Sequence, residues 1–498
     1  MPATEQKKGL NSKDIHFIIG TLIIYGFGYI CPPFGGIQPM GMKMLGVVIG
    51  LIYLTCVSCP ILQSALIALL AFPIHGYMDV STLLTKWTGT TTTFQLVFAG
   101  AVMLGLKETG AMNVIAKKLL SAGFLKGRPA LLMLMLMVVG FLISTNMGGA
   151  PYFLLFFGLI DSIADVAGYD KEDKFIKYAL LGMYVAAYGM FLFPFKGAFA
   201  VTVAFFNTTL QPYGYAFSNN LYMLYDAATF IGFDIVYTLA LKFIFKPDLS
   251  KLAKVDVATV ETFRDVPDHF DKHMKVAFWS AVVCIIYAII CGFGSKWPGF
   301  KVWGALTVTF IWVVPLVLFS IVRVDGRPVF NIAKLTTNAS LWTMIALVGS
   351  MTFLGTICTD TSENMGIRGA IESLFNPIFG NMSIPVLMAI LVVFVVVITQ
   401  VVHGQVLVMG ITAVIVPIIV SRLQAGDAAS PTVILATVSQ AAQVAFLFPS
   451  GSVNAAYVLN RPEMNKKFLF TSGVAVLCIF MVWQYIILMV FNILFSGK

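Results

Sequence analysis

The sequence carries little charge for its length. Asp, Glu, Lys and Arg together make up 11% of the 498 residues, whereas soluble domains carry about 25%. Hydrophobic residues account for 59%, above the roughly 45–50% of soluble chains. This balance excludes a water-soluble enzyme and any disordered or fibrous protein. It predicts an integral membrane protein, because each spanning helix needs about 20 predominantly apolar residues.

Residues that carry chemistry are also scarce. The five histidines and seven cysteines show no metal-ligand spacing, and we find neither a phosphate-binding Gly-rich loop nor a Ser/His/Asp set. The cysteines lie mostly within or beside apolar stretches, where a thiol behaves as a small hydrophobe, so we expect no structural disulfide. We also expect no enzyme activity, no metal and no cofactor, apart from Na⁺ or H⁺ as a coupling ion.

The positive charge follows the apolar runs. A formal net charge of +9 is compatible with nucleic-acid binding, but the basic residues flank apolar segments, as they do in cytoplasmic loops. We therefore expect a lipid bilayer and a small anionic substrate as partners, and no nucleic acid. Lys7, Lys8 and Lys13 precede the first apolar block. They predict a cytoplasmic N-terminus for a multi-pass protein of the plasma (inner) membrane.

The two halves of the chain resemble each other. Phe191-Leu192-Phe193-Pro194 recurs 255 residues later as Phe446-Leu447-Phe448-Pro449, and in each half a long apolar block broken near its middle comes before this motif. Paired interrupted segments indicate the midplane site of an inverted-repeat secondary transporter. We predict an all-α polytopic membrane protein with broken helices and these parts: residues 1–39, the N-terminal segment and first span; 40–246, the first repeat; 247–275, a cytoplasmic linker; and 276–498, the second repeat.

In the first half, Ser144-Thr145-Asn146 interrupts an apolar run. Such residues suit the tip of a re-entrant hairpin that offers N–H groups and oxygens to a cavity; the alternative is a helix-packing contact. Lys196 follows Pro194 in a predicted helix break, and a lysine at membrane depth indicates function by default. It would attract a carboxylate or replace a sodium ion as a fixed charge. The alternatives are a lysine that reaches the membrane interface or pairs with Asp234.

In the second half, His403 is the one histidine inside a long apolar run, with Gln405 two residues on. Its titration range suits proton coupling or pH-sensitive anion binding; the alternative is a neutral histidine bonded to a neighbouring helix. Ser450, Ser452 and Asn454 follow the second predicted break. They would offer hydrogen-bond donors to oxyanions, together with the helix N-terminus behind them.

This double pattern resembles the divalent anion/sodium symporters of the ion transporter superfamily. In each half a predicted hairpin is followed about 50 residues later by a Pro-containing break, and residues 96–120 are similar to that family's helix before the first hairpin. The resemblance implies about 11 transmembrane helices, two re-entrant hairpins, a scaffold subdomain that dimerises and a transport subdomain that moves as an elevator. It also implies hairpin-tip Ser-Asn-Thr triplets that bind carboxylate and sodium, which Thr145-Asn146 keeps in part.

We therefore predict a secondary active transporter of a small organic anion, such as a di- or tricarboxylate, that forms a homodimer. Its coupling is expected to be to protons, or by exchange of anions, because Lys196 and His403 stand near positions that would otherwise donate cation-binding oxygens. The alternatives are a sodium-coupled dicarboxylate symporter, a passive channel, and a cation/proton antiporter that uses Asp234. The predicted substrate-binding residues are Ser144, Thr145, Asn146, Lys196, His403, Gln405, Ser450, Ser452 and Asn454; the ion-coupling candidates are Lys196, His403 and Asp234.

Overall fold

The computed structural model describes residues 11–57, 60–293, 297–360, 362–379, 382–448, 451–452 and 454–496. Within these ranges the chain is helical apart from one short hairpin of β1 (Arg323–Val324) and β2 (Arg327–Pro328), which pair antiparallel. The predicted fold class is confirmed: the protein is an all-α polytopic membrane protein with broken helices.

The helices of the first half follow the apolar blocks of the sequence. They are α1 (Ser12–Ile30), α2 (Pro39–Cys56), α3 (Ile61–Ile74), α4 (Val80–Thr88), α5 (Thr91–Glu108), α6 (Ala111–Leu120), η1 (Gly123–Leu125), α7 (Pro129–Ser144), α8 (Ala150–Ala167), α9 (Lys174–Ala186), η2 (Ala187–Phe191), α10 (Gly197–Leu210), η3 (Gln211–Tyr213), α11 (Asn219–Ala240) and the π-helix η4 (Leu241–Phe245). Three short 3₁₀ helices then occupy the polar linker: η5 (Ser250–Lys254), η6 (Val257–Thr259) and η7 (Glu261–Phe263).

The second half repeats the order of the later helices of the first. It contains α12 (Lys272–Phe293), α13 (Phe300–Trp303), α14 (Thr307–Phe310), α15 (Val313–Ile321), α16 (Ile332–Thr336), α17 (Ala339–Thr359), α18 (Ile367–Phe379), α19 (Ile384–Thr399), α20 (Gly404–Gln424), α21 (Pro431–Ala441), α22 (Ala455–Leu459), α23 (Lys466–Phe468), the π-helix η9 (Leu469–Gly473) and α24 (Val474–Phe495). Helices α7 and α19 begin 255 residues apart, and so do α11 and α24. The interval of the Phe-Leu-Phe-Pro motif therefore also separates matching helices.

Length and composition identify the membrane-crossing helices. Among the described residues, five helices are long and apolar enough to cross a membrane, or up to seven if each of two bent pairs forms one span. The bent pairs are α4 with α5, at 44°, and α13–α14 with α15, at 78°. Helix α7 has 16 residues and is about 24 Å long, which is less than the roughly 30 Å hydrocarbon core. This length suits one arm of a re-entrant hairpin, and α19 has the same 16 residues.

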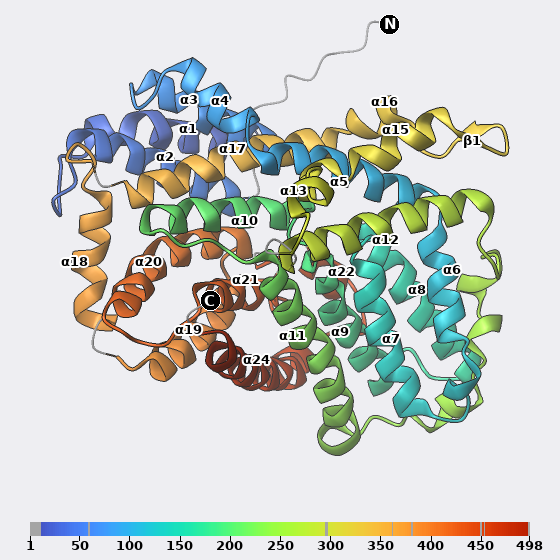
Figure 1. Cartoon of the computed structure of the whole chain (residues 1–498). Coiled ribbons are helices and arrows are strands. Elements are labelled where there is room, and N and C mark those ends of the chain that lie inside the picture. The colour runs from blue at the N-terminus through green and yellow to red at the C-terminus, as the bar shows by residue number, and fades with distance from the viewer. Residues whose placement is uncertain are drawn as a thin grey trace, which may run out of the picture.

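After each break, the helix of one half packs against helices of the other half. Helix α10, which follows the break after α9, packs against α17 and α20 of the second half. Helix α22, which follows the break after α21, packs against α9, and its Tyr457 stacks on Phe153 of α8 with ring centroids 4.8 Å apart. In Figure 1, α11 and α21 lie between the first hairpin (α7–α8) and the second (α19–α20), and α10 runs above α20. Each broken helix thus begins beside one hairpin and continues toward the other.

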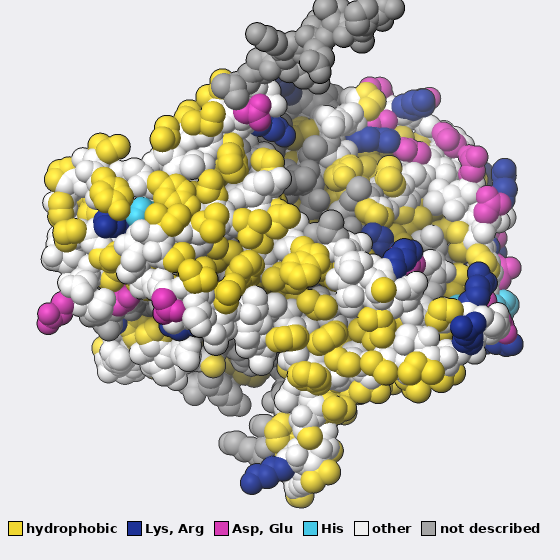
Figure 2. All heavy atoms as spheres, turned by 90° about the horizontal axis from the view of Figure 1, so that it is seen from above, with side chains coloured by type: hydrophobic (Ala, Val, Ile, Leu, Met, Phe, Trp, Pro, Cys, Tyr) yellow, Lys and Arg dark blue, Asp and Glu magenta, His cyan; other side chains and the backbone are white. Residues whose placement is uncertain are grey.

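The surface suits a lipid environment. Large apolar side chains such as Leu22, Leu154 and Ile493 are 65%, 73% and 71% exposed, and extensive exposed apolar surface indicates contact with a membrane. Hydrophobic side chains cover much of the face in Figure 2, whereas many charged side chains gather toward one edge of that view. The polytopic membrane assignment therefore rests on the surface as well as on helix length.

An ion pair ties the second break to the first hairpin. Arg461, just after α22, donates to both carboxylate oxygens of Asp161 on α8 (Nη1–Oδ2 3.0 Å, Nη2–Oδ1 2.5 Å) and to Glu463 (Nε–Oε2 3.1 Å). The side chain of Glu463 is 8% exposed and that of Arg461 is 24% exposed. The cation therefore pairs with two carboxylates, one of which is buried.

Substitution of Arg461 with alanine is expected to lower stability by about 2 kcal/mol, because it leaves a buried carboxylate beside a second one without a cation. The apparent melting temperature of the detergent-purified protein measures this loss. Lys126→Ala is the matched control, since Lys126 and Asp256 form a surface pair with side chains 60% and 39% exposed; its expected loss is below about 1 kcal/mol. Equal shifts for the two variants would contradict the assignment of Arg461.

Candidate functional site

The tip of the first hairpin is closed by its own hydroxyls. Ser144, at the end of α7, is fully buried, and its Oγ lies within hydrogen-bond distance of Phe141 O (2.8 Å) and of Ala186 O (3.1 Å) at the end of α9. Thr145 Oγ1 donates to Leu142 O at 2.6 Å. These hydroxyl protons are used to attach the tip to carbonyls of α7 and α9. In this conformation the two side chains therefore hold the tip in place.

Asn146 has a different environment. Its Nδ2 donates to Met103 O of α5 at 3.2 Å. Its Oδ1 is buried and, within the described part of the chain, has no hydrogen-bond partner. A buried unpaired acceptor is uncommon and costs free energy. Of the three predicted tip residues, Asn146 therefore keeps a free side-chain oxygen for an external donor or cation.

Lys196 lies at the first break, immediately before α10. Pro194 and a positive φ of 56° at Gly197 interrupt the helix here, since proline lacks a donor and glycine tolerates a positive φ. Lys196 has extended backbone angles, and its Nζ donates to the carbonyl of Thr145 at the hairpin tip. Neither alternative interpretation matches this contact, because the ammonium points to the tip and Asp234 has no hydrogen-bond partner among the described residues.

The second hairpin repeats the first one's contact. Thr399 ends α19 as Ser144 ends α7, and its Oγ1 donates to Ala442 O, just past the end of α21, at 2.7 Å. Glycine permits the close approach of the break. A Cβ on Gly451 would lie 2.3 Å from Thr399 O, closer than such atoms can pack. In both halves a hydroxyl at the end of the hairpin's first arm thus bonds the end of the broken helix.

Gln400 occupies the position that Thr145 holds in the first half. It is 4% exposed, and its Nε2 donates to Val396 O (2.9 Å) and Val444 O (2.7 Å). Its Oε1 accepts from the N–H groups of Phe446 (3.2 Å) and Leu447 (3.3 Å). One side chain therefore satisfies three backbone groups of the second break. At both hairpin tips a side-chain nitrogen lies where the tip meets a break, Lys196 in the first half and Gln400 in the second.

His403 and Gln405 lie beyond this tip, at the start of α20. Because α19 ends at Thr399, the counterpart of Ser144-Thr145 is Thr399-Gln400, four residues before the histidine. His403 is the N-cap of α20, and its Nδ1 accepts from Gln405 N at 3.4 Å. Gln405 Oε1 accepts from Thr202 Oγ1 of α10 at 3.2 Å. Both side chains are half-buried. They join the second hairpin to the helix that follows Lys196.

Residues of the second break contact tyrosines of α9 and η2 at the first break. Tyr184 donates to the carbonyl of Ala445, and Tyr188 donates to Tyr184 Oη at 2.6 Å. The Ser452 hydroxyl interacts with both tyrosines and accepts from Asn454 N at 3.2 Å. Ser452 and Asn454 therefore lie near the first break, while the predicted site residue Ser450 lies outside the described residues.

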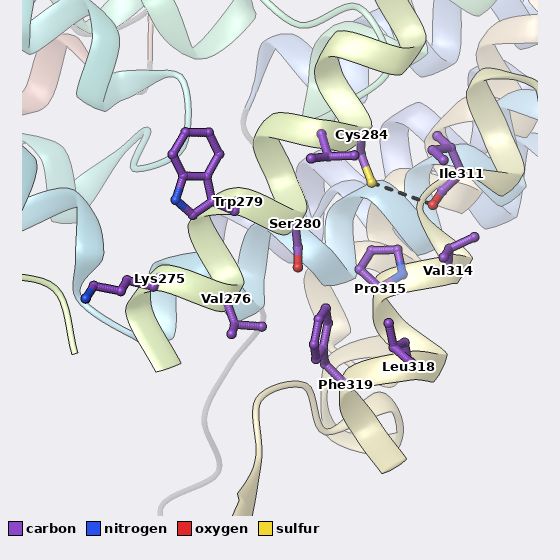
Figure 3. Close-up of a pocket in the computed structure, with 11 residues that line it drawn as sticks. Lys275, Val276, Trp279, Ser280, Cys284, Ile311, Val314, Pro315, Leu318 and Phe319 are labelled. Carbon is purple, nitrogen blue, oxygen red and sulfur yellow. Dashed lines mark hydrogen bonds between the residues drawn. The ribbon is translucent and has the colours of Figure 1, made fainter. Parts of the chain in front are cut away.

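Several hollows occur away from the hairpin tips, and two of them differ clearly in lining. A cavity of about 380 Å³ between α12 and α15 is lined mainly by apolar side chains such as Val276, Pro315 and Leu318; Figure 3 also shows Cys284 bonded to Ile311 O. A second hollow, of about 590 Å³, has a polar wall that includes Lys43, Tyr77 and Asp360. The apolar cavity does not suit a small anion. The polar hollow has a carboxylate in its wall, so neither matches an anion site as well as the hairpin tips do.

Sequence reasoning missed two buried polar residues. Gln400 could have been found by adding the 255-residue interval to Thr145. Asp226 lies on α11 together with Asp234, and sequence reasoning considered only Asp234. Both carboxyl groups are fully buried; Asp226 Oδ1 accepts from Gln440 Nε2 and lies 3.1 Å from Tyr222 Oη. Two carboxylates within a single apolar helix were a signal that the sequence already contained.

Comparison with solved structures shows the fold. The structure is similar to MtrF of Neisseria gonorrhoeae, described as illuminating a class of antimetabolite efflux pumps, with a TM-score of 0.52, 12% identity, and coverage of 95% of this chain and 97% of that one. It also matches the YdaH transporter of Alcanivorax borkumensis, whose topology is described as unusual, with a TM-score of 0.45, 13% identity, and coverage of 83% and 86%. No family model and no curated protein sequence matches the chain. The likeness to MtrF shows the fold, which is that of a polytopic membrane protein.

Proposed function

We propose that the protein is a secondary active transporter of a small organic anion that bears a carboxylate. One observation carries the proposal: the ammonium of Lys196 contacts the carbonyl of Thr145 at a hairpin tip, and among the described residues no carboxylate pairs with it. A half-buried cation without a counter-ion favours an anion beside it. Asn146, with its unpaired Oδ1, lies in the same tip and can accept from a protonated carboxyl group.

The proposed transport does not depend on sodium. A sodium site needs converging oxygen atoms that no internal cation already occupies. In the first half Lys196 donates to the tip carbonyl, and in the second half the Gln400 amide donates to Val396 O and Val444 O. Both hairpin tips thus meet fixed side-chain donors. These contacts favour proton coupling or anion exchange over sodium symport.

The remaining parts of the proposal follow from the resemblance to the divalent anion/sodium symporters. We propose di- or tricarboxylates as substrates, a homodimer, and movement of the hairpins with the broken helices as an elevator. The exchange of α10 and α22 between the halves supports this movement, because it links both hairpins and both breaks into one packed unit. We place the protein in the plasma (inner) membrane with a cytoplasmic N-terminus.

Uptake into proteoliposomes tests the function and its coupling together. Radiolabelled succinate and citrate are the probes, and sodium and pH gradients are imposed separately. We expect counterflow of at least one probe, accumulation driven by a pH gradient or by an internal anion, and no change when choline replaces sodium. Strict sodium dependence would contradict the roles of Lys196 and Gln400. Flux that is not accelerated by trans substrate would indicate a channel instead.

A further inference from the structure

Asp226 joins the two broken helices through hydrogen bonds. It lies on α11, is 0% exposed, and its Oδ1 accepts from Gln440 Nε2 of α21 at 3.0 Å and lies 3.1 Å from Tyr222 Oη. Tyr222 Oη is also 2.9 Å from the carbonyl of Phe191, the last residue of η2 at the first break. Gln440 is the penultimate residue of α21, directly before the second break. One carboxyl group is therefore linked to both breaks, through Gln440 to the second and through Tyr222 to the first.

The protons in this network can be counted. A tyrosine hydroxyl carries one proton, so Tyr222 cannot donate to Phe191 O and to Asp226 Oδ1 together. Each of these hydrogen bonds has a proton when Asp226 is a carboxylic acid. The proton on Oδ1 is then donated to Tyr222 Oη, and Tyr222 donates to Phe191 O. Oδ1 still accepts from Gln440. Asp226 Oδ2 has no hydrogen-bond partner in the part of the chain that the structure describes, which costs a neutral carbonyl oxygen less than a carboxylate oxygen.

The surroundings of Asp226 supply no positive charge. Helix α11 packs against α7, α9, α12, α21, α24, η2 and η4, and α7 and α21 contain no ionisable side chain. The titratable groups that interact with Asp226 are the tyrosines of its own helix, Tyr222 and Tyr225. On the other packed elements Cys478 is exposed. The remaining ionisable side chains have partners elsewhere or stand near helix ends: Lys174, Lys177, Tyr178, Tyr184, Tyr188, Lys242, Lys272, His273, Lys275, Cys284, Tyr287, Cys291 and Tyr485.

We propose that Asp226 is the proton-binding site of this transporter. This inference rests on the proposed function and names the residue that carries the coupled proton. Binding converts the Asp226 carboxylate and one H⁺ into a carboxylic acid; release returns the proton to water on the other side of the membrane. The protonated acid orders the relay from Asp226 through Tyr222 to Phe191 O, which is five residues before Lys196.

Loss of the proton changes the first break. The Asp226 carboxylate then accepts the hydrogen bond from the Tyr222 hydroxyl, so Tyr222 no longer donates to Phe191 O. An unsatisfied buried carbonyl is costly, so the break would be rearranged or hydrated when Asp226 is ionised. The position of Lys196, and with it the affinity for an anion, thus depends on the proton at Asp226. Coupling between the two ligands follows, because each changes the binding of the other.

Substitution of Asp226 with asparagine separates coupling from transport. Asparagine keeps the shape and supplies a permanent N–H to Tyr222, as the protonated acid does, but its Nδ2 cannot accept from Gln440 Nε2. In proteoliposomes with radiolabelled succinate or citrate, Asp226→Asn should exchange internal for external probe at a rate within about twofold of wild type. Its accumulation driven by an inward pH gradient should fall at least about tenfold, in the range of typical coupling energies.

Asp234→Asn is the matched control, because Asp234 is a second fully buried carboxylate on the same helix; it should keep both activities. Retained gradient-driven accumulation in Asp226→Asn, or its loss in Asp234→Asn alone, would overturn the proposal. If Asp226→Asn fails to fold, Tyr222→Phe is the second variant, because it removes the relay hydroxyl and leaves the Asp226 acid in place. Tyr222→Phe should still exchange the probe but should lose gradient-driven accumulation. Accumulation at the wild-type level would count against the relay.

An infrared measurement is independent of transport. In detergent-solubilised wild type, the carboxyl band that responds to pH should be present, should disappear in Asp226→Asn and should persist in Asp234→Asn. If wild type exchanges none of the carboxylates tested while this infrared band behaves as expected, the result would reject the proposed substrate class and leave the proton site in place. A pH-sensitive band that survives in Asp226→Asn would reject the site even if transport occurs.

Discussion

Substitution of Lys196 with methionine is expected to lower uptake of the carboxylate probe about 100-fold, the largest effect of any single change proposed for transport. Methionine is unbranched and only one atom shorter than lysine, and it carries no charge, so both the donor to Thr145 O and the attraction for an anion are lost. Removing one partner of a desolvated charge pair costs about 2–5 kcal/mol, and each 1.4 kcal/mol is a factor of ten in affinity. Initial uptake rates in proteoliposomes measure the effect.

The control for Lys196→Met is Lys86→Met, because Lys86 is an exposed lysine near the end of α4. It changes the net charge by the same amount and should leave uptake within about twofold, as expected for a surface substitution. Uptake by Lys196→Met at the wild-type rate would reject Lys196 as an anion-binding residue. If added sodium restores uptake by Lys196→Met, the result would support the interpretation that the Lys196 ammonium stands in place of a bound cation.

The breaks and hairpins were accessible to sequence reasoning because hydrocarbon makes polar residues expensive. Ser144-Thr145-Asn146, Pro194 and Lys196 have no reason to interrupt apolar runs except to serve a site or a contact, and the structure places each at a helix end. The bends within the α4–α5 and α13–α15 pairs were not foreseen. They depend on packing of the two helices against the rest of the molecule, and local composition does not encode that packing.

The candidate site was only partly predictable for a related reason. A hydroxyl at a hairpin tip can bond a substrate or a helix carbonyl, and both uses need the same residue. Ser144 donates to carbonyls of α7 and α9, a contact that no sequence pattern distinguishes from substrate binding. Gln400 resembled an ordinary packing amide until the position of α21 revealed three backbone groups of the second break around it. The role proposed for Asp226 likewise depends on its contacts with Tyr222 on α11 and Gln440 on α21.

Substitution of Gln400 with alanine is expected to lower stability by about 3 kcal/mol, the largest loss expected outside the apolar core. It leaves Val444 O and the N–H groups of Phe446 and Leu447 without the Gln400 partner, and each buried group left unsatisfied costs about 1–3 kcal/mol. Gln95→Ala is the matched control, because Gln95 is also buried and its Nε2 donates to a single carbonyl, Val308 O, at 3.3 Å. Its melting temperature in detergent should fall by about a third as much.

The isosteric change Gln400→Glu tests whether a cation can replace the amide. The new carboxylate would still accept from Phe446 N and Leu447 N, but its second oxygen would face Val396 O and Val444 O, where Nε2 now donates at 2.9 and 2.7 Å. Three oxygens at that point need a proton or a cation between them, since hard cations prefer oxygen ligands. Sodium chloride should therefore raise the melting temperature of Gln400→Glu relative to choline chloride, by the linkage of ligand binding to folding, and leave wild type unchanged. A sodium-induced shift of equal size in wild type would mean that a cation already binds without displacing the amide, and sodium coupling would then return as the better account of the second hairpin.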